Sequence, residues 1–181
     1  MWFFFSAWNV FPSLQNLQCD AEQVGKKTNL PSDLRAIAAN KGFLVSENQA
    51  SGNCLFHALS EQLQSVKGIQ ISHEELRQTL VQFLDENPNL HEGTPLLNFV
   101  SGYPSWREYL QSMAKDGTWG DHMVLLAAAN YFQTPIRIIS SLNSEIVVPP
   151  EHSVADPTPL VLGHIHELHY VSLQPRQGRT F

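Results

Sequence analysis

Cysteine is scarce in this sequence. Cys19 and Cys54 are the two that occur among 181 residues, which is too few for a disulfide framework or for a zinc site built from four cysteines. Because free thiols persist in reducing compartments, this composition favours a cytoplasmic location.

Basic residues are also few. The chain holds 11 Lys and Arg against 17 Asp and Glu, which gives a formal net charge of -6. A protein that binds a phosphate backbone needs a basic surface, so the composition argues against nucleic acid as the main partner. An acidic surface suits a basic protein partner instead.

No hydrophobic run is long enough to cross a bilayer, which takes about 20 residues. The most apolar stretch is the N-terminal MWFFFSAWNVF, and it lacks the basic start and the small-residue cleavage pattern of a secretion signal. It also lacks a cationic face, so we expect it to dock on protein rather than to anchor in a membrane. We divide the chain into a peripheral segment at 1–31, one folded domain at 32–175 and a tail at 176–181.

Most helices are predicted from their capping residues. Ser72 and Ser105 each open a capping box with a glutamate three residues later. Ser32 is expected to cap a short helix that Gly42 ends, and Asp121 is expected to cap another. Short runs, most of them rich in β-branched residues, predict strands at 42–46, 136–139, 145–148, 160–162 and 170–173. Helices followed by a small sheet indicate an α+β (mixed α/β) domain.

Cys54 is placed where a loop becomes a helix. Leu55, Leu59 and Leu63 repeat every four residues after it, while a turn with Gly52 precedes it. A thiol at a helix start meets the positive end of the helix dipole, which lowers its pKa, and the free N–H groups of the first turn can hold an oxyanion. The alternative is that Cys54 is a small buried hydrophobe.

Three histidines lie close together near the other end of the chain. Any of His164, His166 and His169 could meet Cys54 in the fold, as thiol catalysis requires, although sequence separation alone does not bring them together. With Glu167 they could also ligate zinc. The segment is predicted as strand-turn-strand and lacks the helical HExxH motif, so zinc is the weaker interpretation, and two of the three histidines are expected to be solvated turn residues.

Three blocks of the sequence resemble signatures of the ovarian-tumour (OTU) family of cysteine proteases. The family's nucleophile motif, D-G-N-C-L-F-x-A-L, resembles SGNCLFHAL at 51–59. Its middle signature, G-x-W-G-[DS]-x, is similar to GTWGDH at 117–122, and its late His-aromatic pair is similar to His169-Tyr170. The blocks occur in family order and at family spacing across residues 32–174.

The resemblance implies a papain-like OTU fold, in which a small central sheet is packed between helical regions, and deubiquitinase activity. Cys54 would attack the isopeptide carbonyl at the C-terminal Gly of ubiquitin or a ubiquitin-like modifier. His169 would be the general base, and later the acid for the leaving lysine amine. The backbone N–H groups of Ser51, Gly52, Asn53 and Cys54 would form the oxyanion hole.

The resemblance also assigns a substrate channel and a partner. Trp119 and Tyr170 would shape a narrow channel for a Gly-Gly tail, although Trp119 could equally be a core residue. The partner would be ubiquitin or polyubiquitin, whose basic face suits an acidic surface, and no cofactor or metal is implied.

The sequence departs from the family pattern at the residue that orients the histidine. The family most often has an aspartate three residues before the cysteine, where this chain has Ser51, or an Asn or Asp two residues after the histidine, where it has Val171. Ser51 could orient His169 through its hydroxyl, Glu47 or Asn48 could substitute, or the site could work as a Cys-His dyad. Two other functions remain open at this point: a ubiquitin-binding pseudo-enzyme with little or no activity, and a protease that processes a viral or mobile-element polyprotein.

Overall fold

The computed structural model describes residues 30–48, 51–152, 158–166 and 168–176. The aromatic N-terminal stretch and residues 177–181 therefore lie outside the described residues. The described elements are α2 (Leu30–Asn40), β1 (Phe43–Ser46), α3 (Cys54–Lys67), α4 (His73–Glu86), the 3-10 helix η1 (Leu96–Phe99), α5 (Trp106–Met113), α6 (His122–Tyr131), β2 (Ile136–Ser140), β3 (Glu145–Val148), β4 (Leu160–Ile165) and β5 (His169–Pro175).

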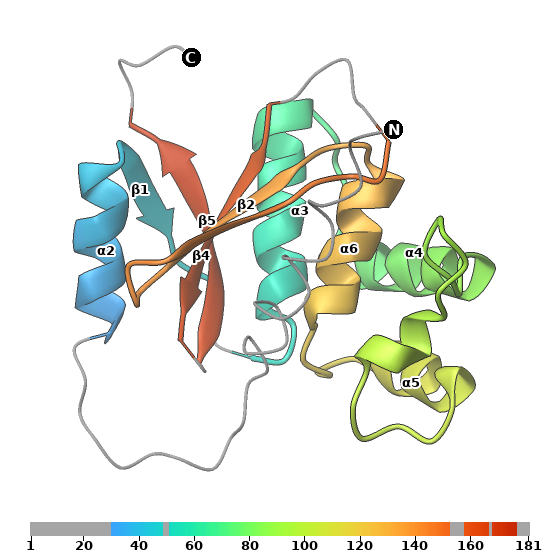
Figure 1. Cartoon of the computed structure of the whole chain (residues 1–181). Helices are drawn as coiled ribbons and strands as arrows, with labels where there is room; N and C mark the ends of the chain where they lie inside the picture. Colours follow the sequence, from blue (N-terminus) through green and yellow to red (C-terminus); the bar gives the residue numbers. More distant parts are fainter. Residues whose placement is uncertain (1–29, 49–50, 153–157, 167, 177–181) are drawn as a thin grey trace, which may run out of the picture.

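A mixed five-stranded sheet organises the fold, with strand order β1-β5-β4-β2-β3 (Figure 1). Strand β5 pairs antiparallel with both β1 and β4, β4 pairs parallel with β2, and β3 closes the sheet as an antiparallel hairpin with β2. The last strand is therefore central and the first strand lies at an edge. This α+β architecture confirms the predicted fold class.

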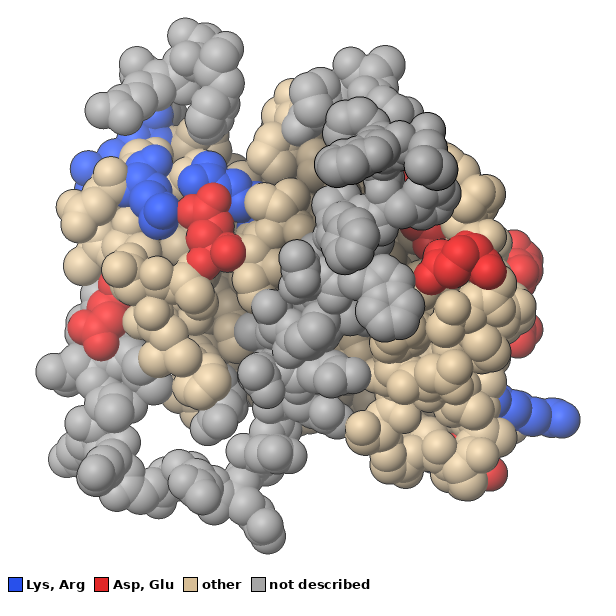
Figure 2. All heavy atoms as spheres, in the orientation of Figure 1, with Lys and Arg blue, Asp and Glu red and all other residues tan. Residues whose placement is uncertain are grey.

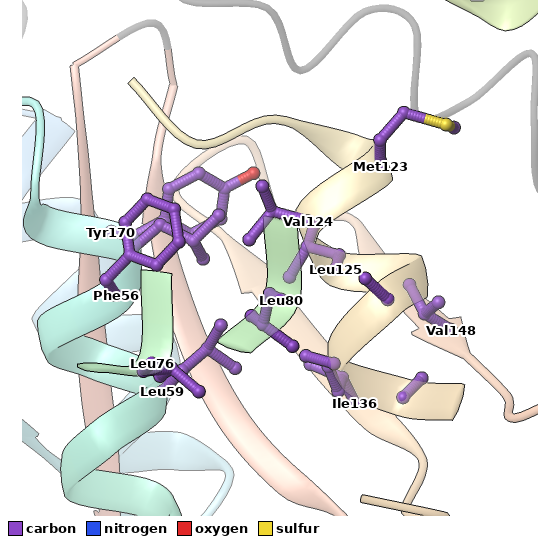
Figure 3. Close-up of a cluster of buried hydrophobic side chains, with 14 of the residues drawn as sticks. Phe56, Leu59, Leu76, Leu80, Met123, Val124, Leu125, Ile136, Val148 and Tyr170 are labelled. Atoms are coloured by element: carbon purple, nitrogen blue, oxygen red, sulfur yellow. The ribbon is translucent and has the colours of Figure 1, made fainter. Parts of the chain in front are cut away.

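Helices cover both faces of the sheet. Helix α2 lies on one face, over a small cluster that includes Leu34, Val171 and Leu173. Helices α3, α4 and α6 lie on the other face around a larger apolar cluster, which Figure 3 shows with Phe56 of α3 and Tyr170 of β5 as members. The sheet is thus buried on both sides, as the predicted arrangement between helical regions requires.

A buried glutamine joins α3 to the centre of the sheet. Gln62 is 1% exposed, and its amide donates to the Ser172 hydroxyl at 2.8 Å and to the Leu173 carbonyl at 2.9 Å. Its side-chain oxygen accepts a hydrogen bond from the Val161 N–H at 2.7 Å. Because all three bonds reach strands β4 and β5, Gln62 fixes where α3 sits along them.

The predicted caps are confirmed at three helices. The Ser72 side chain accepts from the Glu75 N–H at 3.2 Å while the Glu75 carboxylate accepts from the Ser72 N–H at 3.1 Å, a complete capping box. Ser105 caps α5 by accepting from the Glu108 N–H. Asp121 caps α6 by accepting from two backbone N–H groups. The predicted strands are all present, although β1 starts one residue later than expected and β2, β4 and β5 are longer than expected.

The prediction that Ser32 caps the first described helix is wrong. Helix α2 already includes Leu30, so Ser32 lies within the helix rather than before it. The reason is Pro31: its fixed backbone angle and missing N–H suit the first turn of a helix, where no N–H partner is needed. The helix ends before Gly42, whose φ of 88° is the left-handed conformation that glycine adopts readily.

Charge is unevenly spread over the surface. On the face in Figure 2, Lys and Arg side chains gather on the side where α2 lies. Glu145 balances part of this charge, because it pairs with Lys41 at 2.9 Å and with Arg137 at 2.7 Å. None of the helices in the described ranges has the length and apolarity that crossing a membrane requires.

We expect Gln62→Leu to lower the free energy of unfolding by about 2–4 kcal/mol, because three buried partners lose their hydrogen bonds. Urea unfolding followed by circular dichroism measures the change. Gln82→Leu is the matched control, since Gln82 is an exposed residue of α4. Equal stability of the two variants would show that the Gln62 bonds contribute nothing.

Candidate active site

The structure brings Cys54 to the start of β5. Cys54 is the first residue of α3 and is 1% exposed. Its Sγ accepts a hydrogen bond from the Tyr170 N–H at 3.5 Å. Tyr170 directly follows His169, so the sulfur lies against the strand position that carries the histidine. The predicted nucleophile therefore contacts the residue next to the predicted base, although the two lie far apart in sequence.

The prediction of a lowered pKa for Cys54 is wrong. Burial raises the pKa of the Cys54 thiol from its ordinary value of 9.0, because the protein interior penalises the thiolate. The backbone N–H groups of Tyr170, Leu55 and Cys54 itself lower the pKa, as its position at a helix start predicts, but the desolvation effect is larger. The resting site favours the neutral thiol.

His169 is held in its neutral form. It is 6% exposed, and burial lowers its pKa from the ordinary 6.5. The backbone of Asn48 and the carboxylate of Glu47 act in the opposite direction but more weakly. Neither ring nitrogen of His169 makes a hydrogen bond of normal geometry with the residues that the structure describes. A neutral imidazole with an open nitrogen is the form that a general base needs.

Neither position where the family usually has an orienting residue forms a hydrogen bond with the His169 ring. The Ser51 hydroxyl accepts a hydrogen bond from the Asn53 N–H at 3.3 Å, and within the described ranges it makes none with His169. Val171 is 0% exposed and packs in the cluster beneath α2, so it contributes only apolar packing.

The segment after β1 comes closest to replacing the missing orienting residue. The Asn48 amide donates to the Cys54 carbonyl at 3.2 Å, while its backbone lies near His169. Glu47 also lies near His169, but its carboxylate pairs with the exposed Arg35 at 2.7 Å. Asn48 thus touches both ends of the Cys-His pair, which makes it the better placed of the two substitutes.

The nucleophile loop is packed tightly against the loop after α5. The Asn53 side chain accepts from the Gly117 N–H at 3.0 Å and donates to Asp116 at 2.9 Å. A Cβ atom on Gly52 would lie 1.6 Å from the Gly117 carbonyl oxygen, so glycine alone fits there. The first two sequence blocks of the motif are therefore in direct contact.

Two of the four amides predicted for the oxyanion hole are engaged in the resting loop. The Asn53 N–H donates to the Ser51 hydroxyl and the Cys54 N–H donates to the Ser51 carbonyl at 3.0 Å. Each of these N–H groups could donate to an oxyanion only if its present hydrogen bond within the turn were broken or shared. The oxyanion-hole assignment stays a prediction.

The two residues predicted to shape the channel differ in exposure. Trp119 is 41% exposed, so it is not a core residue. It precedes Gly120, where a Cβ would lie 2.8 Å from Leu55 and 3.1 Å from Phe56, so Trp119 lies beside the start of α3. The Tyr170 side chain is 2% exposed and belongs to the larger core cluster. Only its backbone N–H faces the sulfur, and the channel itself stays a prediction.

His164 is not the solvated turn residue that the sequence predicts. It lies on β4, is 0% exposed, and its ring centroid is 4.6 Å from that of Tyr170. Burial lowers its pKa to about 4. His166 does lie in the turn after β4 and is partly exposed. In the described part of the chain, no group of three His, Cys, Asp or Glu side chains is arranged to hold a metal ion.

Sequence reasoning misses Arg77, which is buried under the nucleophile loop. Its helical spacing with Leu80 and Leu84 places it on the apolar face of α4, and a charged residue on such a face is the signal that could have found it.

Comparison with known proteins identifies the family. The family model for OTU-like cysteine proteases matches residues 49–171, which is more than half of the chain. The chain belongs to this family. The match begins just before the nucleophile loop and ends on β5, so it covers Cys54 and His169 but not Glu47 and Asn48.

Relatives from viruses and plants support the assignment. A protein of Invertebrate iridescent virus 3, provisionally named ubiquitin thioesterase 232R, is 30% identical over 167 residues, which cover 85% of this chain and 19% of that protein. Ovarian tumor domain-containing deubiquitinating enzyme 10 of Arabidopsis thaliana is 32% identical over 153 residues, covering 71% of this chain and 40% of that enzyme. The chain therefore spans less than half the length of either relative.

The OTU fold itself is matched by a solved structure. An OTU deubiquitinase of Wolbachia pipientis wMel, crystallised bound to ubiquitin, superposes with a TM-score of 0.57 at 16% identity. The match covers 75% of this chain and 98% of the Wolbachia protein. The described domain thus contains nearly the complete fold of that OTU domain.

We expect the alkylation rate of Cys54 in the free OTU domain to rise through pH 9 without a plateau near neutral pH. The reason is that burial raises the pKa of the thiol and the thiolate is the reacting form. Iodoacetamide labelling, with the Cys54 peptide quantified by mass spectrometry, measures this. A constant rate between pH 6 and 8 would instead reveal a resting thiolate–imidazolium pair.

We expect acid to destabilise the domain through His164. Its pKa of about 4 in the folded state lies below the ordinary 6.5, so only the unfolded chain takes up this proton between those values. The contribution of His164 to the free energy of unfolding is complete above pH 6.5, falls by about 3 kcal/mol as the pH drops to 4, and does not change further below pH 4.

His164→Phe should remove this part of the acid loss, because a phenyl ring keeps the packing against Tyr170 and takes up no proton. Urea unfolding at pH 4.5 and pH 7 measures how much the free energy of unfolding falls between the two pH values. His91→Phe, at an exposed position, is the control and should show the same fall as the parent. If His164→Phe loses as much unfolding free energy between pH 7 and pH 4.5 as the parent does, His164 is not the cause of the acid destabilisation.

Proposed function

We propose that this chain is a cysteine-type deubiquitinase that hydrolyses isopeptide bonds at the C-terminal glycine of ubiquitin. The observation that carries the proposal is the hydrogen bond from the Tyr170 N–H to the Cys54 sulfur, because it holds the thiol at the strand position of His169. A nucleophilic thiol beside a neutral imidazole is the chemistry that thiol proteases use.

The reaction begins with both groups uncharged. Burial disfavours the Cys54 thiolate and the His169 imidazolium alike. His169 takes the thiol proton as the sulfur attacks the carbonyl carbon of the substrate glycine. The tetrahedral oxyanion collapses to a thioester, and the imidazolium gives its proton to the leaving lysine amine. Water, activated by His169, then attacks the thioester, which releases the ubiquitin carboxylate and restores the thiol.

Ubiquitin is proposed as the substrate because the named relatives point to it. One carries ubiquitin thioesterase in its name, another is a deubiquitinating enzyme, and the Wolbachia structure contains ubiquitin. The exposed Trp119 beside the start of α3 could contact the extended tail as it enters the site. We also propose a reducing, cytoplasmic setting, because the reaction needs a free Cys54 thiol.

Asn48 is proposed as the group that steadies His169 in place of a carboxylate. Its backbone raises the pKa of the imidazole and its side-chain amide is tied to the Cys54 carbonyl. A neutral group gives the imidazolium less stabilisation than a carboxylate does, so we propose a slow enzyme rather than a decayed one.

We expect the parent protein to release the fluorophore from ubiquitin-aminomethylcoumarin and Cys54→Ala to release none. His169→Ala should reduce kcat by about 10²–10⁴-fold, the usual contribution of a general base. His166→Ala is the matched control, because it removes a nearby imidazole from the turn between β4 and β5.

Two other outcomes would replace the proposal. If the parent binds ubiquitin but neither turns over nor forms a covalent bond with a ubiquitin C-terminal vinyl sulfone, the domain is a ubiquitin-binding pseudo-enzyme. If it ignores ubiquitin yet cleaves peptide bonds in a polyprotein, the family chemistry serves another substrate.

A further inference from the structure

Arg77 is the largest buried polar side chain near the site, and the proposed mechanism does not use it. It lies on α4, is 2% exposed, and its guanidinium carbon is 3.9 Å from the centroid of the Phe56 ring on α3. Burying a charge is costly unless its donors are satisfied. Both terminal nitrogens of Arg77 have acceptors, while its Nε has no hydrogen-bond partner among the described residues. The contacts of the terminal nitrogens therefore show what Arg77 does.

Those contacts join three segments that meet around the nucleophile. One terminal nitrogen of Arg77 donates to the Met113 carbonyl at the end of α5, at 2.8 Å. The other donates to the Gly52 carbonyl at 3.2 Å, to the Asn53 side-chain oxygen at 2.6 Å and to the Thr118 carbonyl at 2.8 Å. All four acceptors are neutral oxygens. The acidic group nearest this network, Asp116, is reached through Asn53 rather than directly.

The Asn53 side chain extends the network to the backbone of the second loop. Its oxygen accepts from Arg77 and from the Gly117 N–H together, while its amide donates to Asp116. Gly52 lies so close to the Gly117 carbonyl that a Cβ atom on it would clash with the oxygen. The guanidinium is thus the common donor for the nucleophile loop and the loop after α5.

We propose that Arg77 is a positioning residue of the active site, which holds the Gly52–Asn53 peptide with its carbonyl oxygen turned toward the buried guanidinium. In a trans peptide the C=O and N–H groups point in opposite directions, so fixing the oxygen also fixes the N–H. A flipped peptide would present a carbonyl oxygen to the developing oxyanion and repel it. Arg77 acts through the loop and touches no reacting atom.

Arginine suits this role better than lysine. Its planar guanidinium offers several donors in fixed directions, whereas an ammonium group is a compact point charge on a flexible chain. Four acceptors on three segments need that spread of donors. Arg77→Lys keeps the positive charge and the helical structure of α4. It therefore tests the geometry of the hydrogen-bond donors and not the charge of the side chain.

The inference rests on the proposed deubiquitinase function, and the experiment separates the two. We expect Arg77→Lys to lower kcat for ubiquitin-aminomethylcoumarin by about 10–100-fold, less than the about 10²–10³-fold cost of removing an oxyanion donor outright, with KM changed less than about threefold. An inactive parent ends the proposed function. An active parent with an equally active Arg77→Lys overturns the role of Arg77.

A second readout does not depend on turnover. Hydrogen exchange of the Gly117 amide should accelerate at least about tenfold in Arg77→Lys, because the Asn53 oxygen that accepts it loses its anchor. The matched control is Leu80→Val, a milder core change on the same face of α4. It should lower Tm while keeping kcat and Gly117 exchange close to the parent's values. If Leu80→Val lowers kcat as far as Arg77→Lys does at equal Tm, or if Gly117 exchange stays at the parent rate in Arg77→Lys, the positioning role is wrong.

Discussion

Two polar contacts hold helix α3 on strand β5, and the geometry of the site depends on these two contacts. The Cys54 sulfur accepts a hydrogen bond from the Tyr170 N–H at the start of the helix. Eight residues later, the Gln62 amide donates to Ser172 and Leu173. Eight helical residues span about 12 Å and three strand residues about 10 Å, so helix and strand advance together in the same direction. Two fixed points along one line prevent the helix from sliding, and apolar packing alone would not do so.

A second set of polar contacts fixes the loops at the end of this pair. Asn48 ties the segment after β1 to the first turn of α3, while Arg77 and Asn53 tie the nucleophile loop to residues 116–118. Buried polar groups that are well satisfied specify one arrangement more sharply than apolar contacts do, because each alternative leaves a donor or acceptor unpaired. The apolar clusters hold the layers together, and the polar contacts decide how the loops lie.

The sequence predicts the elements of this fold well because their signals are local. The capping boxes at Ser72 and Ser105 mark helix starts to the residue, and the β-branched runs mark the strands. The strand order is not predictable in the same way, since nothing local says that β5 lies between β1 and β4. Ser32 fails as a cap because a proline beside it extends the helix one turn further back.

At the site, residue types are predictable but their environments are not. The motif predicts Cys54 and His169 as the catalytic pair, and the fold places the Cys54 sulfur against the residue that follows His169. The direction of the Cys54 pKa shift comes out opposite to the prediction, because burial depends on the long-range contact with β5 and outweighs the helix dipole. His164 is mistaken for a turn residue for a similar reason: only the pairing of β4 with β5 shows that its ring packs on Tyr170. The structural roles of Arg77 and Gln62 are not predicted, because the function of a polar residue on an apolar helix face becomes clear only when its hydrogen-bond partners are known.

The protonated, enclosed state of Cys54 has a consequence for oxidative stress. Peroxide attacks thiolates far faster than thiols, and it must reach the sulfur to do so. A cysteine that is 1% exposed and carries a raised pKa meets neither condition in the free protein. Sulfenic acid formation should therefore be slow until His169 takes the thiol proton during turnover, which leaves the idle protein resistant to hydrogen peroxide and the working one vulnerable.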